Sequence, residues 1–190
     1  MLGLGIPTAV DVNLDKPANR HYTPLAGDVT FHFPARGKKS PFTLHWYEGR
    51  ARPPKLDGMK ELPADGMYMI GSKETLYNEG IFPASPQLWP RERMANYRDI
   101  LRKRPLARVE AGPFQELFSW IKDDGPKTGS HFDYASQLTE VVLLGAMAIR
   151  SGGNLKWDVE NMNVTNAPEL SEWVKEPVRG GWSYGEGFWV

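Results

Sequence analysis

The chain has 190 residues, and its 23 lysine and arginine residues balance its 23 aspartate and glutamate residues, so the formal net charge is zero. This balance excludes a sequence-independent nucleic-acid binder, which needs a clear excess of basic side chains. An apolar share of 41% with 7 Trp, 7 Tyr and 8 Phe excludes a disordered chain. The absence of cysteine excludes a disulfide scaffold, a zinc–thiolate site and a cysteine nucleophile. The length predicts one large domain or a domain with long excursions.

The chain shows no sign of membrane targeting in its sequence. No stretch approaches the ~18 consecutive apolar residues that a membrane span needs. The first seven residues carry no Lys or Arg and no sustained apolar run, so they do not match a signal peptide. We therefore expect a soluble protein that binds neither membrane nor nucleic acid, and we favour the cytoplasm.

The first half of the chain is typical of strands joined by turns. Apolar and polar residues alternate in residues 8–12, 28–33 and 42–47, a pattern that predicts strands with one apolar face. The basic turn at 34–41 would join the second and third of these as an antiparallel pair. If they pair, His32, His45 and Tyr47 share one face, which is either a polar or subunit-interface face or a face that contacts substrate. A second hairpin is expected from residues 66–70 and 75–77.

The second half favours helices. Residues 113–122 begin with proline in the first turn and carry an apolar stripe at Phe114, Leu117, Phe118 and Ile121. A longer helix is predicted from Tyr134 or Gln137 to Arg150, ended by the glycines that follow. Gly145 lies on the apolar stripe of that helix, which predicts a close approach of the helix to the sheet.

Together these elements predict an α+β fold: an open, mainly antiparallel β-sheet with the helices packed on one face. Residues 155–159 alternate as one more strand. The second face of an open sheet needs a partner, either another subunit or another domain.

A dense polar and aromatic cluster precedes the long helix. Residues 129–134 read Gly-Ser-His-Phe-Asp-Tyr. One interpretation is local: Asp133 or Ser136 caps the helix and the aromatic rings join the core. The other is a turn that contacts a ligand through His131, Asp133 and Tyr134.

The remaining motifs do not indicate a cofactor, metal or nucleic-acid site. Gly3-Leu-Gly5 lacks the preceding strand, the third glycine and the following helix of a dinucleotide loop. None of the four histidines has the helical spacing of a metal site. The basic residues between 91 and 108 are offset by acidic ones, which favours a solvated helix over a nucleic-acid patch.

The chain resembles the C-terminal portion of bacterial Gfo/Idh/MocA-type oxidoreductases. The resemblance rests on residues 129–135, on Leu-Thr-Glu-Val-Val-Leu-Leu-Gly-Ala-Met-Ala-Ile-Arg at 138–150, and on Leu-Lys-Trp-Asp at 155–158 followed by Asn-Val-Thr-Asn at 163–166. Shorter matches lie at 5–8, 33–37, 44–47 and 181–182. His131 stands where relatives often have asparagine.

The resemblance implies one domain over residues 1–190, which binds substrate and forms oligomers, without the Rossmann domain that binds NAD(P). The Lys, Asp and His segments with which relatives perform catalysis would lie upstream, so no catalytic, cofactor-binding or metal-binding residue is expected in this chain. His131, Asp133, Tyr134, His32, His45 and Tyr47 are the candidate substrate-binding residues. The implied partners are a small sugar or polyol, a separate Rossmann-domain chain, and further copies of this chain through the sheet face.

Two functions follow from this sequence. The first is the substrate-binding and oligomerisation domain of a nicotinamide-dependent sugar or polyol oxidoreductase, inactive alone because hydride transfer needs a bound cofactor and a base. The alternative is a stand-alone binding or assembly module with no redox chemistry.

Overall fold

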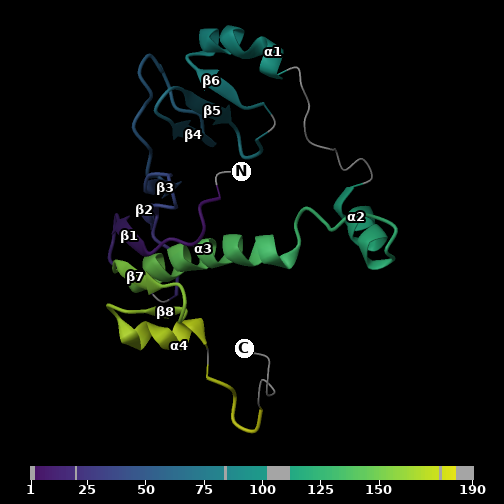
Figure 1. The fold of residues 1–190 in the computed structure, drawn as a ribbon. Coiled ribbons are helices and arrows are strands. Elements are labelled where there is room, and N and C mark those ends of the chain that lie inside the picture. Colours follow the sequence, from purple (N-terminus) through teal and green to yellow (C-terminus); the bar gives the residue numbers. More distant parts are fainter. Residues whose placement is uncertain (1–2, 20, 84, 102–111, 176, 183–190) are drawn as a thin grey trace. The chain divides into compact units, whose positions relative to one another are not determined.

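The computed structural model describes residues 3–19, 21–83, 85–101, 112–175 and 177–182 (Figure 1). It divides the chain into two compact units, one formed by Met1–Arg52 with Gly129–Val190 and the other by Pro53–Thr128. The predicted α+β class with an open antiparallel sheet is confirmed.

An antiparallel sheet forms the centre of the first unit. Its strand order is β3-β2-β1-β7-β8, and each strand pairs antiparallel with its neighbours. The bounds are β1 Ala9–Leu14, β2 Ala26–Phe33, β3 Phe42–Gly49, β7 Leu155–Asp158 and β8 Asn163–Val164. Burial alternates along the whole of β2, so the period-two pattern of its sequence corresponds to one buried face and one solvated face.

One long helix, α3 (Phe132–Ser151), packs against β1 and β2 on the buried face of this sheet. It begins before the predicted Tyr134 or Gln137 and ends at Gly152, whose left-handed backbone lets its N–H bond to the Ala148 carbonyl. The chain then continues through η2 (Pro168–Leu170) and α4 (Ser171–Val174). The Arg150 guanidinium lies 4.5 Å from the centre of the Trp173 ring, which links α4 to the end of α3.

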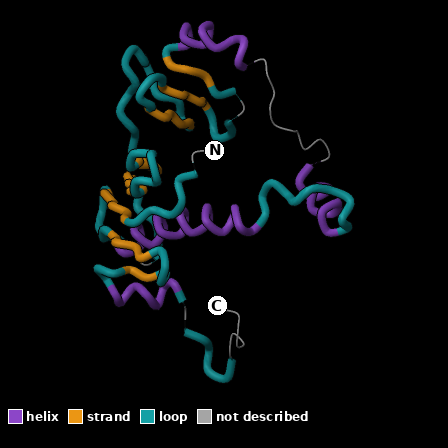
Figure 2. The backbone as a smooth tube through the Cα atoms, in the orientation of Figure 1, coloured by secondary structure: helices purple, strands orange, loops and turns teal. Residues whose placement is uncertain are grey.

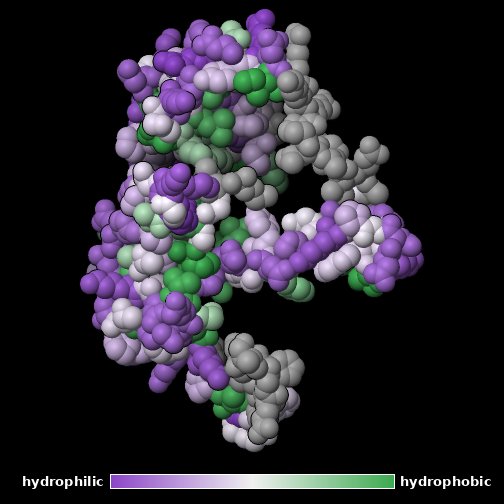
Figure 3. Space-filling model, viewed as in Figure 1, coloured by the Kyte–Doolittle hydropathy of each residue, from purple (hydrophilic) through white to green (hydrophobic). Residues whose placement is uncertain are grey.

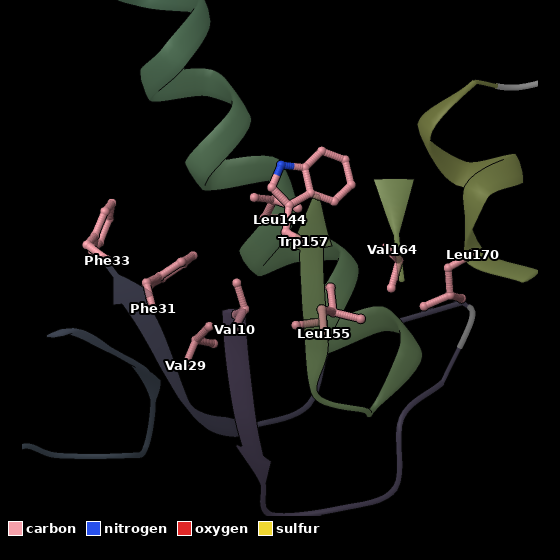
Figure 4. Packing of buried hydrophobic residues seen from close by; sticks show 10 residues of the cluster. Val10, Val29, Phe31, Phe33, Leu144, Leu155, Trp157, Val164 and Leu170 are labelled. Carbon is pink, nitrogen blue, oxygen red and sulfur yellow. The ribbon is translucent and has the colours of Figure 1, made fainter. Parts of the chain in front are cut away.

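The core of the first unit lies between α3 and the sheet. Figure 4 shows Val10, Phe31 and Leu155 on three neighbouring strands, with Leu144 of α3 nearby. The predicted close approach at Gly145 is confirmed, because a Cβ atom there would lie 2.7 Å from the Phe31 ring. Glycine is therefore required by space at this position, which offsets its low helix propensity.

The second unit contains a smaller sheet of order β4-β5-β6, with bounds Gly66–Ile70, Thr75–Glu79 and Gln87–Trp89. The predicted hairpin is present as β4 and β5. Its helices are η1 (Arg91–Tyr97), α1 (Arg98–Leu101) and α2 (Gly112–Ile121). Glu74 accepts hydrogen bonds from Arg93 and from the Tyr97 hydroxyl, which holds η1 against the β4–β5 turn.

Helix α2 carries the predicted apolar stripe, but none of its residues is buried. Phe114, Phe118 and Ile121 are all more than half exposed. Of the two predicted sheet-covering helices, α3 covers the large sheet and α2 belongs to the second unit. The basic residues between 102 and 108 lie outside the described residues, so the helix predicted there is described only as far as Leu101.

Candidate functional site

The solvated face of β1, β2 and β3 carries an ordered set of polar side chains. The strand register places Asp11, Thr30 and His45 in one row and Asn13, Asp28 and Tyr47 in the next. His32 lies in the row beyond, between Ala9 and Thr43. The prediction that His32, His45 and Tyr47 share one face is therefore confirmed. We call this surface the outer face.

Each histidine of the outer face has a carboxylate neighbour. His32 Nε2 lies 2.7 Å from Asp11 Oδ2 and donates to it when protonated at that atom. His45 Nδ1 lies 3.0 Å from Thr30 Oγ1 and 3.7 Å from Asp28 Oδ1, the second distance being too long for a hydrogen bond. Asp28 Oδ1 is buried and has no hydrogen-bond partner among the described residues. An unpaired buried acceptor is unfavourable. The Asp28 side chain as a whole is 30% exposed, so its carboxylate is accessible from the outer face.

The outer face also carries two aromatic rings on its edge strand. The rings of His45 and Tyr47 lie 6.1 Å apart between centroids and are within 19° of parallel. At the end of the same strands, a cavity of about 200 Å³ is lined by Asn13, Asp28 and Ala51 among others. Asp28 thus belongs both to the cavity and to the surroundings of His45.

The second group of predicted site residues lies at the start of α3. The helix begins one residue after His131, so His131 occupies the N-cap position, where its side chain makes no capping hydrogen bond. The expectation that Asp133 or Ser136 caps the helix is therefore wrong, because the helix begins before both residues. Asp133 lies in the first turn instead, where its negative charge is stabilised by the helix dipole.

His131 and Asp133 form a loose pair. His131 Nδ1 lies 3.4 Å from Asp133 Oδ2, within ion-pair range if the imidazole is protonated. The same Nδ1 atom is buried and makes no hydrogen bond to a described residue. Tyr134 follows on the next position of the helix and is 42% exposed.

The helix that follows this pair carries exposed apolar side chains. Figure 2 shows that the amino-terminal half of α3 extends beyond the strands. Two large apolar residues of that half, Phe132 and Leu138, are more than half exposed, and so are Val142 and Leu143 at the start of the second half. In Figure 3 the visible surface mixes hydrophilic and hydrophobic side chains, with hydrophobic ones in separate patches.

The six candidate residues form two groups rather than one. Helix α3 packs on the buried face of the sheet through Gly145 and Phe31, whereas His32, His45 and Tyr47 lie on the opposite face. Sequence reasoning missed Asp11, Asp28 and Thr30 as their neighbours. The alternation that identified the histidines also places these three on the outer face, but only the strand register shows which of them meet.

The glycine pair near the start of the chain does not form a dinucleotide-binding loop. Gly3 and Gly5 lead into β1, an antiparallel strand, and not into the amino terminus of a helix where a pyrophosphate binds. No three acidic or histidine side chains in the described part of the chain lie close enough together to hold a metal ion. None of the described helices has both the length and the apolar character needed to cross a bilayer.

Comparison of the chain with protein families, curated proteins and solved structures found no match in any of the three.

Proposed function

We propose that the chain is the substrate-binding domain of a nicotinamide-dependent sugar or polyol oxidoreductase and requires a separate nicotinamide-binding domain for activity. The observation that supports this most is the start of α3. There a histidine whose buried Nδ1 atom makes no hydrogen bond to a described residue lies 3.4 Å from an aspartate, on a helix that carries exposed apolar side chains. This combination is what a substrate domain would present to a cofactor domain.

In this proposal His131 and Asp133 bind and orient a substrate hydroxyl. The imidazole nitrogen can accept or donate a hydrogen bond, and the carboxylate can accept one, so together they suit a group that both donates and accepts. The nicotinamide-binding domain would supply the hydride acceptor and cover Phe132, Leu138 and Val142, which are exposed in this chain.

Self-association through the sheet face stays a prediction. The outer face is polar over β1, β2 and β3, so burial of apolar surface gives no reason for a second subunit there. The exposed apolar residues on α2 and α3 are the stronger physical reason to expect a partner.

The test is nicotinamide reduction over a panel of sugars and inositols, measured with the chain alone and with a nicotinamide-binding domain supplied upstream or as a separate chain. We expect no reduction above background with the chain alone and substrate-dependent reduction with the second domain. Turnover by the chain alone would contradict the proposal, because the chain would then contain a complete active site of its own. A lack of turnover with every cofactor domain tried, together with a lack of sugar binding near α3, would favour the module without redox chemistry.

A further inference from the structure

We propose that the outer face of β1–β3 is a binding surface for neutral pyranose sugars. The sugar ring would lie against the rings of His45 and Tyr47, and Asp28 would accept hydrogen bonds from its hydroxyls. This surface lies on the opposite side of the sheet from α3. It is therefore separate from the substrate site proposed above and does not depend on redox chemistry.

The aromatic pair supplies the apolar part of the surface. The two rings are stacked within 19° of parallel, so a flat ligand that lies against the exposed side of one ring is also parallel to the other. Aromatic faces carry partial negative charge and attract the weakly positive C–H groups that one side of a pyranose presents. The His45 side chain is 46% exposed, so its ring is accessible.

The polar neighbours supply hydrogen bonds of the kind that hydroxyls need. The Asp28 side chain is 30% exposed beside the His45 ring, so its carboxylate can accept a hydrogen bond from a hydroxyl at the surface. Asp11 on β1 and His32 on the middle strand β2 form a second polar pair, in which a carboxylate and an imidazole can accept from and donate to a second hydroxyl. Every sugar hydroxyl both donates and accepts, which this mixture matches.

Charge and size narrow the ligand class. Asp11 and Asp28 both lie on the surface, so an anionic sugar such as a uronic acid would be repelled. Strands lie about 4.8 Å apart and rise about 3.3 Å per residue, so the distance from Asp11 to His45 is about 10 Å and that from His45 to Tyr47 about 7 Å. These dimensions suit one or two pyranose rings. The cavity beside Asp28 adds about 200 Å³ at one end of the surface.

The test is an NMR titration of the full chain with methyl β-glucopyranoside, cellobiose and glucuronate. We expect amide shifts in β2 and β3 with the two neutral sugars and much smaller ones with glucuronate. Tyr47→Ala should weaken binding by about tenfold, the size of one lost contact of about 1.4 kcal/mol. Tyr47→Phe keeps the ring and should retain most of the affinity, and Asp28→Asn should weaken it several-fold.

Two control variants establish whether the sugar binds at this surface. Glu48→Gln lies on β3 but faces the other side of the sheet from Tyr47, and it should bind as the wild type does. His131→Ala tests the proposed redox site and should leave these shifts unchanged. Wild-type affinity in both Tyr47→Ala and Asp28→Asn would overturn the proposal. So would an absence of shifts with every neutral sugar, and so would a dimer that Tyr47→Ala dissociates while no sugar binds, because the outer face would then be a subunit interface.

Discussion

The two halves of α3 both carry large apolar side chains, but these side chains have different surroundings. In the carboxyl-terminal half, Leu144, Gly145 and Ala148 are buried against the sheet. In the amino-terminal half, Phe132 is 89% exposed and Leu138 55% exposed, although both are as apolar as the buried residues. An apolar stripe therefore predicts a helix and its apolar side, but it does not say what covers that side.

The difference between the halves separates stability from function in this unit. The packed half stabilises the fold through contacts that the described chain supplies itself. The open half places His131, Asp133 and apolar side chains together at the surface, which is the arrangement expected where a partner and a ligand meet. Substitutions in the two halves should therefore differ in what they change.

The largest difference is expected from matched leucine truncations. Leu144→Ala removes a side chain that is 2% exposed and should lower the free energy of unfolding by about 2–5 kcal/mol. Leu138→Ala, in the open half of the same helix, should change it by no more than about 0.5 kcal/mol. Urea denaturation of both variants measures this directly, and equal losses would show that the open half is packed in solution.

A smaller effect is expected from overpacking at Gly145. A Cβ there would lie 2.7 Å from the Phe31 ring, so Gly145→Leu should destabilise the protein by about 1–3 kcal/mol. Ala146→Leu is the matched control, because Ala146 is the next residue on the helix and is exposed. An unchanged denaturation midpoint in Gly145→Leu would refute the close contact.

A side-chain hydrogen bond links α3 to β7. The Trp157 ring is buried, and its Nε1 atom donates a hydrogen bond of 2.8 Å to Glu140 Oε1. Trp157→Phe keeps most of the apolar contact but removes the donor, and should cost about 1–3 kcal/mol, towards the lower end because Glu140 is partly solvated. Glu140→Gln keeps an acceptor and should cost less than Trp157→Phe. The reverse order of the two variants in thermal unfolding would contradict the stabilising role of this bond.

The smallest effect concerns Asp158 at the end of β7 and the turn that follows it. Hydrogen bonds from the Asn161 side chain and backbone, with a smaller one from the Glu160 backbone, lower the pKa of Asp158 below its ordinary value. The charged carboxylate is the bound form, so its contribution is present above the ordinary aspartate pKa and is lost as the pH falls through the lowered pKa. Asn161→Ala should raise the Asp158 pKa toward the ordinary value in an NMR pH titration. A titration curve that does not move in this variant would show that the side-chain bond is not formed.

Much of the first unit could be predicted from its sequence. Alternation places Val29 and Phe31 on one face and His32 on the other, because side chains along a strand point alternately to the two faces. Gly145 predicts a close contact because glycine in a helix needs a reason. The residue that contacts Gly145 depends on tertiary packing, so Phe31 could not be identified in advance.

Other features depend on contacts between distant residues. The pairing of Thr30 with His45 and of Asp28 with Tyr47 requires the register, which a pattern of period two does not fix. The sequence predicts too late a start for α3 because Asp133 and Ser136 are good capping residues, yet the backbone enters the helix at His131. The apolar stripe of α2 does not predict that the helix is exposed. It does not predict the division of the chain into two units either.

The most direct test of the proposed function compares the two halves of α3 in an enzyme supplied with its nicotinamide-binding domain. The measurement is kcat/KM for nicotinamide reduction with the best sugar or polyol substrate. If His131 binds a substrate hydroxyl, His131→Ala should lower kcat/KM by about tenfold or more, as the loss of one hydrogen bond in the transition state would. Ala146→Ser, an exposed change in the packed half, should leave it unchanged. Full activity in His131→Ala, or equal losses in the two variants, would contradict the assignment of the open half of α3 to substrate binding.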